Sequence, residues 1–363
     1  MGFRNLLMTK FRLGFNTSPH DLIGGGRRSM RPTALGGRRA MLWPSLLRAR
    51  TASRALHLTV ADPTRPVSKV RTVPLRKMTL DLHAGGEADG DPGASIDLVL
   101  PNDWRDVPHS PTEPPFWVLP WPSGSAIAAH LLKDGALVSR KRCIDMGCGL
   151  APAGLAAALA GASHVVLADK DGCALQCAMH GAAANGVEDL CSVHELDWSR
   201  AAHEEDLLPP SLAGSFDVVL ASDLFYEDDG GSPLARLLPR LLKPEGGTLL
   251  LGLPTESEYR RASQASHDAA AASVRKLREE AGFAVESIME ARGAQLPGMG
   301  PEGLAAARRV VLATMTLGSS GGERAGPGKS GGDDDIGRGA GAETKVSPLA
   351  SHVSSLLTRL VGD

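Results

Sequence analysis

The chain has 363 residues, 42% of them hydrophobic, and a formal net charge of −2 at pH 7, which is ordinary for a globular protein of one large or two small domains with a sizeable core. Its apolar runs are shorter than the roughly 18 residues that a transmembrane helix needs, so membrane insertion is excluded. The five cysteines and eleven histidines form neither a C-x-x-C pair nor an H-E-x-x-H pattern, so we expect reduced structural thiols and no metal site.

Residues 1–60 differ in charge from the rest of the chain. They contain ten arginines and one lysine but a single acid, Asp21. An arginine-rich, acid-poor leader with an amphipathic start is typical of organelle targeting. We therefore predict a targeting or disordered segment with a mitochondrial address, and a plastid as the alternative. A basic nucleic-acid-binding arm would have the same composition, and so would a gene start placed too early in a cytoplasmic protein.

Residues 61–99 are expected to form an N-terminal extension with short strands. Two strand-like segments, 77–82 and 96–100, flank a loop rich in glycine and aspartate, which predicts a small ribbon ahead of the main domain.

A proline-rich loop at 108–123 follows, and it contains Trp117 and Trp121. Proline at this density excludes a helix or a central strand. Ser123 or Ser125 is expected to cap the next helix. The two tryptophans are candidates for a wall of a cofactor or substrate pocket, although core packing is an equally good explanation of Trp117.

Residues 143–171 have the pattern of a strand, a glycine turn, a helix and a second strand that ends at Asp169. Glycines in such a turn allow a ligand to approach the backbone, and an acid about 20 residues on can accept from both ribose hydroxyls. The dinucleotide fingerprint needs a third glycine where this chain has Pro152, so a pyrophosphate site is disfavoured. The remaining D-x-G-x-G pattern begins at Asp145 and resembles motif I of the class I S-adenosylmethionine-dependent methyltransferases. A glycine turn in an unrelated α/β protein is the alternative.

Two further strands are expected to end at candidate site residues. A helix at 174–185 precedes a strand at 193–196, which runs into Asp197 and Trp198. A carboxylate and an aromatic ring at a strand end suit an adenine, although Trp198 could equally be a core residue. The strand at 216–222 is clearer and runs into Asp223.

The remaining elements complete a sheet of seven strands. They are a helix at 237–242, a strand at 248–253, a helix at 273–281 and strands at 283–289 and 310–316. Residues 318–363 are rich in Gly, Ser and Asp and are expected to be a disordered tail, with a possible short helix at 349–360. The main domain is therefore assigned to residues 100–317.

Several segments together resemble the family 16 seven-strand protein methyltransferases, which include many protein-lysine methyltransferases. The segments are PPFWVLPWPSGSAIAAHLL (114–132), DMGCGLAPAGLAAALAGAS (145–163), Asp169, Asp197-Trp198 and VVLASDLFYED (218–228). The resemblance implies an α/β fold, namely a Rossmann-like seven-strand class I methyltransferase sheet with helices on both faces. It also implies S-adenosylmethionine as cofactor and a lysine-bearing protein as substrate. Members often have an asparagine where this chain has Gly181, which puts cofactor contacts from that helix in doubt.

The resemblance also assigns roles to individual residues. Asp223 and Tyr226, from the D-x-x-Y element, would be catalytic, and Trp117 and Phe225 would line the substrate pocket. A helix cap is the structural alternative for Asp223. The residues expected to bind the cofactor are Trp121, Asp145, Gly147, Gly149, Asp169, Asp197, Trp198 and Ser222.

Three classes of function fit this sequence. A protein-lysine methyltransferase is favoured, followed by a methyltransferase that acts on arginine, histidine or a small molecule. A cofactor-binding scaffold without catalysis is the third. Basic residues beyond position 60 are scattered, so no nucleic-acid partner is expected. We expect a monomer.

Overall fold

The computed structural model describes eight stretches of the chain. They are residues 56–61, 70–82, 94–109, 115–202, 208–224, 232–254, 274–294 and 309–318. The predicted targeting segment up to residue 55, the tail beyond 318 with its possible helix, and the site candidates Phe225 and Tyr226 lie outside the described residues.

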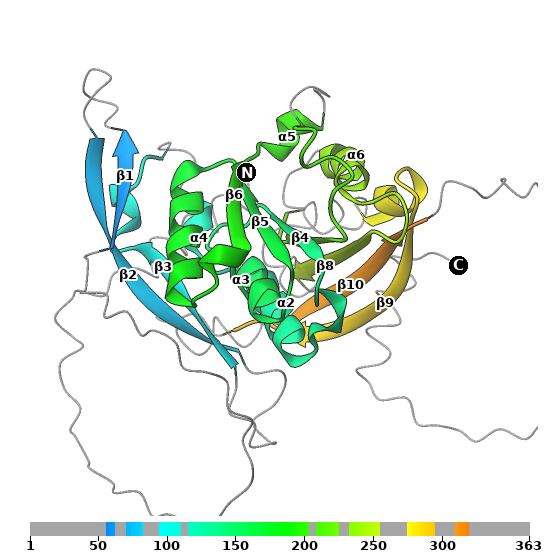
Figure 1. Cartoon of the computed structure of the whole chain (residues 1–363), viewed down its shortest axis with the longest axis horizontal. Helices are drawn as coiled ribbons and strands as arrows, with labels where there is room; N and C mark the ends of the chain where they lie inside the picture. Colours follow the sequence, from blue (N-terminus) through cyan, green and yellow to red (C-terminus); the bar gives the residue numbers. More distant parts are fainter. Residues whose placement is uncertain are drawn as a thin grey trace, which may run out of the picture.

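The main domain contains a seven-stranded sheet in the order β6-β5-β4-β7-β8-β10-β9 (Figure 1). The first five strands in this order run parallel, and β10 pairs antiparallel with both β8 and β9. Within this sheet the chain first forms β4, continues outward through β5 to β6 and then returns to form β7 on the other side of β4. The direction of winding therefore reverses between β4 and β7. Ligands of doubly wound sheets bind at such a point, outside the carboxyl ends of the strands. The strands are β4 Arg142–Met146, β5 His164–Asp169, β6 Cys191–Glu195, β7 Val218–Ser222, β8 Thr248–Pro254, β9 Phe283–Arg292 and β10 Arg309–Leu317.

Helices cover both faces of this sheet, so the predicted fold class is confirmed. On β4, Cys143 belongs to one buried cluster and Ile144 to the other, because successive side chains of a strand point to opposite faces. The central strands are therefore apolar on both sides, as parallel strands between helices must be. The first face carries α2 Pro122–Lys133, α3 Pro152–Leu159 and α4 Gly172–Ala184; the second carries α5 Trp198–Ala201, α6 Ser232–Leu241 and a helical turn at 274–279.

Three details of these elements differ from the sequence expectations. Helix α2 begins at Pro122, and Trp121 occupies its N-cap position without a side-chain cap bond, so the expected serine cap is wrong. Proline at the first helical position was the available signal, because the missing N–H is not needed there. Strand β6 begins at Cys191 and α6 at Ser232, both earlier than their apolar patterns suggest.

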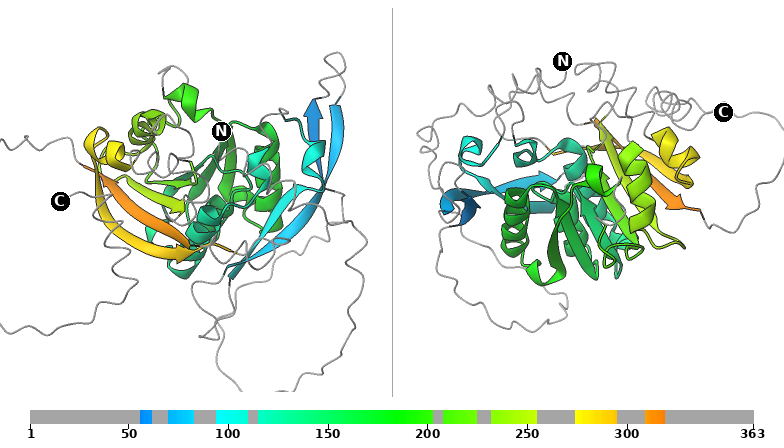
Figure 2. Two further views of the ribbon diagram at one scale, coloured as in Figure 1. Left: turned by 180° about the vertical axis from the view of Figure 1, so that it is seen from behind. Right: turned by 90° about the horizontal axis from the view of Figure 1, so that it is seen from above.

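The predicted N-terminal ribbon is a three-stranded antiparallel sheet of β1 His57–Ala61, β2 Val70–Leu82 and β3 Ala94–Pro101. Its first strand starts within the segment that the sequence assigned to targeting. Figures 1 and 2 show this sheet in blue and cyan beside α4, at the opposite end of the molecule from β9.

Two side-chain amides join the N-terminal sheet to α4. Asn185 donates to the carbonyl of Asp97 at 2.7 Å and accepts from its N–H at 3.1 Å. Gln176 makes the same pair of bonds with the backbone of Thr59, both at 3.1 Å. At Gly181 a Cβ would lie 3.2 Å from Leu155 Cδ1, which is tight, and 3.7 Å from the Asp97 carbonyl oxygen, which is an ordinary contact. Packing against Leu155 thus leaves little room for a longer side chain such as asparagine at 181.

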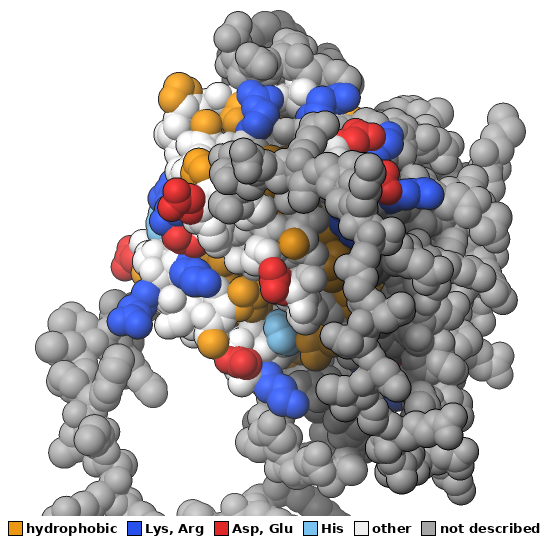
Figure 3. All heavy atoms as spheres, turned by 90° about the vertical axis from the view of Figure 1, so that its right-hand side faces the viewer, with side chains coloured by type: hydrophobic (Ala, Val, Ile, Leu, Met, Phe, Trp, Pro, Cys, Tyr) orange, Lys and Arg blue, Asp and Glu red, His pale blue; other side chains and the backbone are white. Residues whose placement is uncertain are grey.

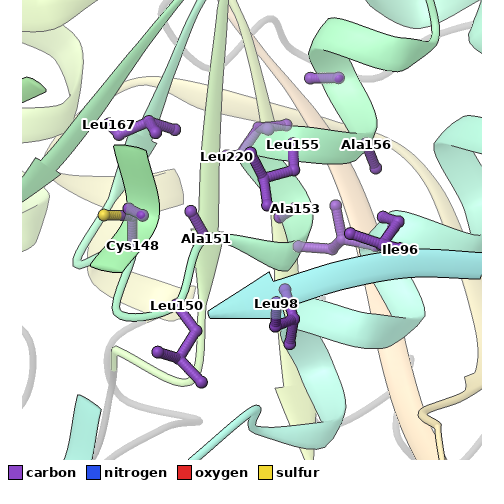
Figure 4. Close-up of a cluster of buried hydrophobic side chains, with 14 of the residues drawn as sticks. Ile96, Leu98, Cys148, Leu150, Ala151, Ala153, Leu155, Ala156, Leu167 and Leu220 are labelled. Atoms are coloured by element: carbon purple, nitrogen blue, oxygen red, sulfur yellow. The ribbon is translucent and has the colours of Figure 1, made fainter. Parts of the chain in front are cut away.

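The apolar side of the N-terminal sheet is part of the main core. Ile96 and Leu98 of β3 lie in one buried cluster with Leu155 of α3 and Leu167 of β5 (Figure 4). The described strands of the extension assigned to residues 61–99 therefore pack as an integral layer of the domain.

Replacing Asn185 with alanine is expected to lower the free energy of unfolding by about 2 kcal/mol, since it removes both bonds to Asp97 and leaves a half-buried backbone pair without its partners. Urea unfolding of the full chain measures this change. Gln176→Ala, at the more exposed contact, is the matched control and should cost less than half as much. Equal effects of the two variants would contradict the prediction.

On the face shown in Figure 3, side chains of both charges are interspersed over the described residues. None of the described helices is both long and apolar enough to span a bilayer.

Candidate active site

The glycine turn after β4 has the backbone that its sequence predicts. Gly147 has φ +59° and Gly149 φ +54°, a region that residues with a Cβ rarely adopt. The intervening Cys148 donates its N–H to the carbonyl of Ala168 at 2.9 Å, which ties the turn to β5. Ala151 also has a positive φ of +60°, and Pro152 then starts α3. The turn therefore presents its backbone at the carboxyl end of the sheet.

Asp145 lies beneath this turn and is 1% exposed. Its Oδ2 accepts the N–H of Gly154, in the first turn of α3, at 2.8 Å. Gly154 has no room for a side chain, since a Cβ would lie 2.4 Å from Leu167 Cδ2. Burial raises the pKa of Asp145 to about 7, against the lowering effect of the Gly154 bond and with a further raising effect of Asp169. The carboxyl group thus connects β4 to α3, and a direct contact with the cofactor stays a prediction.

Asp145→Asn is expected to stabilise the protein above pH 7. Between pH 3.8 and about 7 the folded state binds a proton at Asp145 that the unfolded state does not, so this group's contribution to stability is greatest at low pH and is lost as the pH rises through 7. Asparagine keeps an acceptor for Gly154 and has no charge. We expect a gain at both pH 5 and pH 8, and a gain at pH 8 that is larger by more than about 1 kcal/mol. Urea unfolding at both values measures it, and an equal effect at both would refute it.

Asp169 ends β5 and lies beside the glycine turn. Its Oδ2 accepts the N–H of Gly149 at 2.9 Å and its Oδ1 accepts that of Asp171 at 3.0 Å. It is 8% exposed, and burial raises its pKa despite these two bonds. A carboxylate has about four acceptor positions, so two remain for a diol such as a ribose. The residues at this point fit the predicted cofactor.

The two tryptophans of the proline-rich loop occupy different places. Trp117 is buried in a short 3₁₀ turn, and its indole N–H donates to Asp171 Oδ2 at 2.8 Å. A Cβ at Gly149 would lie 3.2 Å from the Trp117 carbonyl oxygen. Trp117 also belongs to the buried cluster of the first face, so the core explanation of Trp117 is supported, and its contact with the substrate stays a prediction. Trp121 is half-buried and donates its indole N–H to the Phe116 carbonyl at 3.0 Å.

Asp197 and Trp198 follow β6 at the start of the short helix α5. Asp197 Oδ1 accepts the N–H of Arg200 at 3.4 Å, as an acid at a helix start does. Trp198 is 8% exposed and belongs to the buried cluster of the second face. The core explanation of Trp198 is therefore supported, and contacts of either residue with an adenine stay predictions.

Asp223 follows β7 with φ +54°, so the chain turns sharply after Ser222. Its carboxylate accepts two hydrogen bonds from Ser123, one from the N–H at 3.1 Å and one from the hydroxyl at 2.8 Å. Ser123 is in the first turn of α2, so Asp223 caps a helix from a distant part of the chain. The alternative explanation of Asp223 thus has a structural basis, although the capped helix is not the one that follows the strand.

The segment after β7 is in contact with the glycine turn. A Cβ on Gly147 would lie 2.5 Å from Leu224 Cδ2, so Leu224 covers Gly147 directly. Ser222 faces α2, since a Cβ on Gly124 would lie 3.3 Å from the Ser222 hydroxyl. Asp169 and Asp223 therefore lie at the ends of β5 and β7, on either side of β4 and its turn.

Sequence reasoning gave no role at this site to Ser123, which it named only as a possible helix cap, or to Asp171. Asp171 caps α4 through the N–H of Cys173 at 2.8 Å while it also holds Trp117. Its place just before a helix was a usable signal. For Ser123 the partner is 100 residues away, which no local pattern indicates. Within the described residues, no group of three or more His, Cys, Asp or Glu could hold a metal ion.

Residues 119–264 match the family model described as lysine methyltransferase. The electron transfer flavoprotein beta subunit lysine methyltransferase of Xenopus laevis is 29% identical over 157 residues, which cover 43% of this chain and 59% of that protein. The protein of the same name from Danio rerio is 28% identical over 171 residues, with 46% and 62% covered. The chain thus spans about six-tenths of the length of these relatives. The resemblance to methyltransferase family 16 is confirmed.

Among solved structures, magnesium protoporphyrin IX methyltransferase from Synechocystis PCC 6803 with bound S-adenosylmethionine aligns with a TM-score of 0.36 and 18% identity, over 53% of this chain and 76% of that one.

Proposed function

We propose, from the premise that residues 119–264 match the lysine methyltransferase family model, that this protein uses S-adenosylmethionine to methylate a lysine side chain of another protein. One observation of the structure supports this most directly. Leu224 lies against Gly147, so the acid-bearing segment after β7 is beside the turn at which the cofactor would bind.

The cofactor would be held by the residues of the turn and the neighbouring strand ends. Gly147 and Gly149 allow its close approach, Asp169 accepts from the ribose hydroxyls, and Asp197 accepts from the adenine amine. When bound, S-adenosylmethionine supplies a methyl group on a positively charged sulfur, which a neutral amine can attack in line.

The protein must bring that amine to the site in its neutral form. A lysine has a pKa near 10.4 in water, and an apolar aromatic pocket favours loss of its proton because the charged form is poorly solvated there. Asp223 aligns the amine by a hydrogen bond. Phe225, Tyr226 and Trp117 are the residues that would line such a pocket, and a methylated ammonium gains about 0.5–2 kcal/mol from contact with aromatic rings.

The names of the curated relatives indicate which acceptor to test first. Both are electron transfer flavoprotein beta subunit lysine methyltransferases, so we propose that subunit as the candidate substrate. The arginine-rich residues 1–60 support a mitochondrial location, and a fusion of these residues to a fluorescent protein tests it: diffuse cytosolic signal would exclude targeting. We also propose that the enzyme acts as a monomer.

The full chain should be incubated with labelled S-adenosylmethionine and either the purified beta subunit or a fractionated mitochondrial extract. We expect label on a lysine of one protein band, assigned by peptide mapping. Label on arginine, histidine or a small molecule would establish the alternative acceptor class. Cofactor binding in calorimetry with no labelled product in any fraction would instead indicate the non-catalytic scaffold.

A further inference from the structure

Ser123 lies where helix α2 meets the carboxyl end of β7. Its N–H donates to one oxygen of Asp223 and its hydroxyl to the other, at 3.1 and 2.8 Å. Ser123 is 0% exposed, so water does not compete for either donor. One buried residue therefore holds both oxygens of a single carboxylate.

The backbone of Asp223 is held from the other side. Its N–H donates to the carbonyl of Gly252 on β8 at 3.2 Å. A Cβ on Gly252 would lie 3.0 Å from Ser123 Cβ, so β8 comes this close to α2 only because residue 252 has no side chain. Ser123, Asp223 and Gly252 therefore form one packed unit.

We propose that Ser123 is a positioning residue that orients the Asp223 carboxylate toward the acceptor amine. The inference rests on the proposed function, in which Asp223 contacts that amine. An aspartate at a sharp turn past a strand end has several side-chain rotamers, and two hydrogen bonds with fixed directions select one of them. Orientation matters because displacement of a reacting group by about 1 Å can reduce a rate about a hundredfold.

The contact also serves α2, whose N-cap residue Trp121 makes no side-chain cap bond. A test must therefore separate orientation of Asp223 from stability of the helix. Ser125 provides the matched control. It is 1% exposed in the same helical turn, and its hydroxyl bonds to the Pro122 carbonyl at 2.9 Å and the Ala294 N–H at 2.7 Å.

The experiment compares Ser123→Ala with Ser125→Ala in methyl transfer by the full chain, with cofactor affinity measured by calorimetry. We expect Ser123→Ala to lower kcat about tenfold, as loss of one hydrogen bond to a charged group does, with an unchanged Kd for S-adenosylmethionine. Ser125→Ala should stay within twofold of the wild-type kcat. In an Asp223→Asn background, Ser123→Ala should have no further effect, because the two residues act as one unit.

Equal kcat values for the two serine variants would overturn the inference, and so would an undiminished effect of Ser123→Ala in the Asp223→Asn background. Failure of the proposed function has a different result, since the wild-type chain would then transfer no methyl group to any protein.

Discussion

Replacing Asp223 with alanine is expected to lower kcat for methyl transfer by two to three orders of magnitude, about what removal of a positioned catalytic carboxylate costs in other enzymes. The Kd for S-adenosylmethionine should stay within about twofold, because Asp223 is not among the residues proposed to bind the cofactor. Steady-state kinetics with labelled cofactor, together with calorimetry, measures both quantities.

Alanine at a φ of +54° adds backbone strain, so Asp223→Asn is the sharper variant. Asparagine tolerates the left-handed region and can still accept a bond from Ser123, so the fold should be kept while the carboxylate is lost. The control is Asp217→Asn, which should keep wild-type kcat. Asp217 lies just before β7, where it accepts the Arg142 N–H at 2.9 Å. Full turnover by both Asp223 variants would exclude the catalytic role.

Asp169→Ala should weaken S-adenosylmethionine binding about a hundredfold, since two hydrogen bonds to a charged acceptor contribute roughly 1.5–3 kcal/mol each and part of that is regained from water. The variant also deprives the Gly149 N–H of its acceptor, so the turn loses a contact that holds its shape. Calorimetric titration with S-adenosylmethionine measures the loss.

The control for this variant is Asp189→Ala. Asp189 is exposed and lies in the 3₁₀ turn Glu188–Leu190 before β6, at the opposite end of the sheet. The substitution Asp189→Ala removes one carboxylate, as Asp169→Ala does, at a position away from the site. A Kd for Asp169→Ala no weaker than that of the control would show that this acid does not bind the cofactor.

The parallel core was predictable because its signals are local. Apolar runs that each end at a glycine turn or an acid identify β4, β5 and β7 directly, since strands covered on both faces have no polar alternation. The positive φ values of Gly147 and Gly149 likewise follow from residue type.

Contacts between distant segments were not predictable in this way. The bonds from Ser123 to Asp223 and from Trp117 to Asp171 join residues 100 and 54 positions apart, and they depend on how the loop before α2 lies across the strand ends. The sequence also does not indicate the side on which Trp198 packs, because a two-residue motif has no periodicity that would identify a face. In the structure Trp198 belongs to the second buried cluster.

The packing of the N-terminal sheet against α3 and α4 determines where the chain can be shortened for expression. A fragment that starts at residue 100, as the sequence-based boundary suggests, lacks β1, β2 and most of β3. It would leave Leu155 and the rest of that helical layer facing water where Ile96 and Leu98 now cover them, and such a patch promotes aggregation. Asn185 and Gln176 would lose their backbone partners in the same cut. The smallest fragment that keeps the fold closed therefore begins at or before His57.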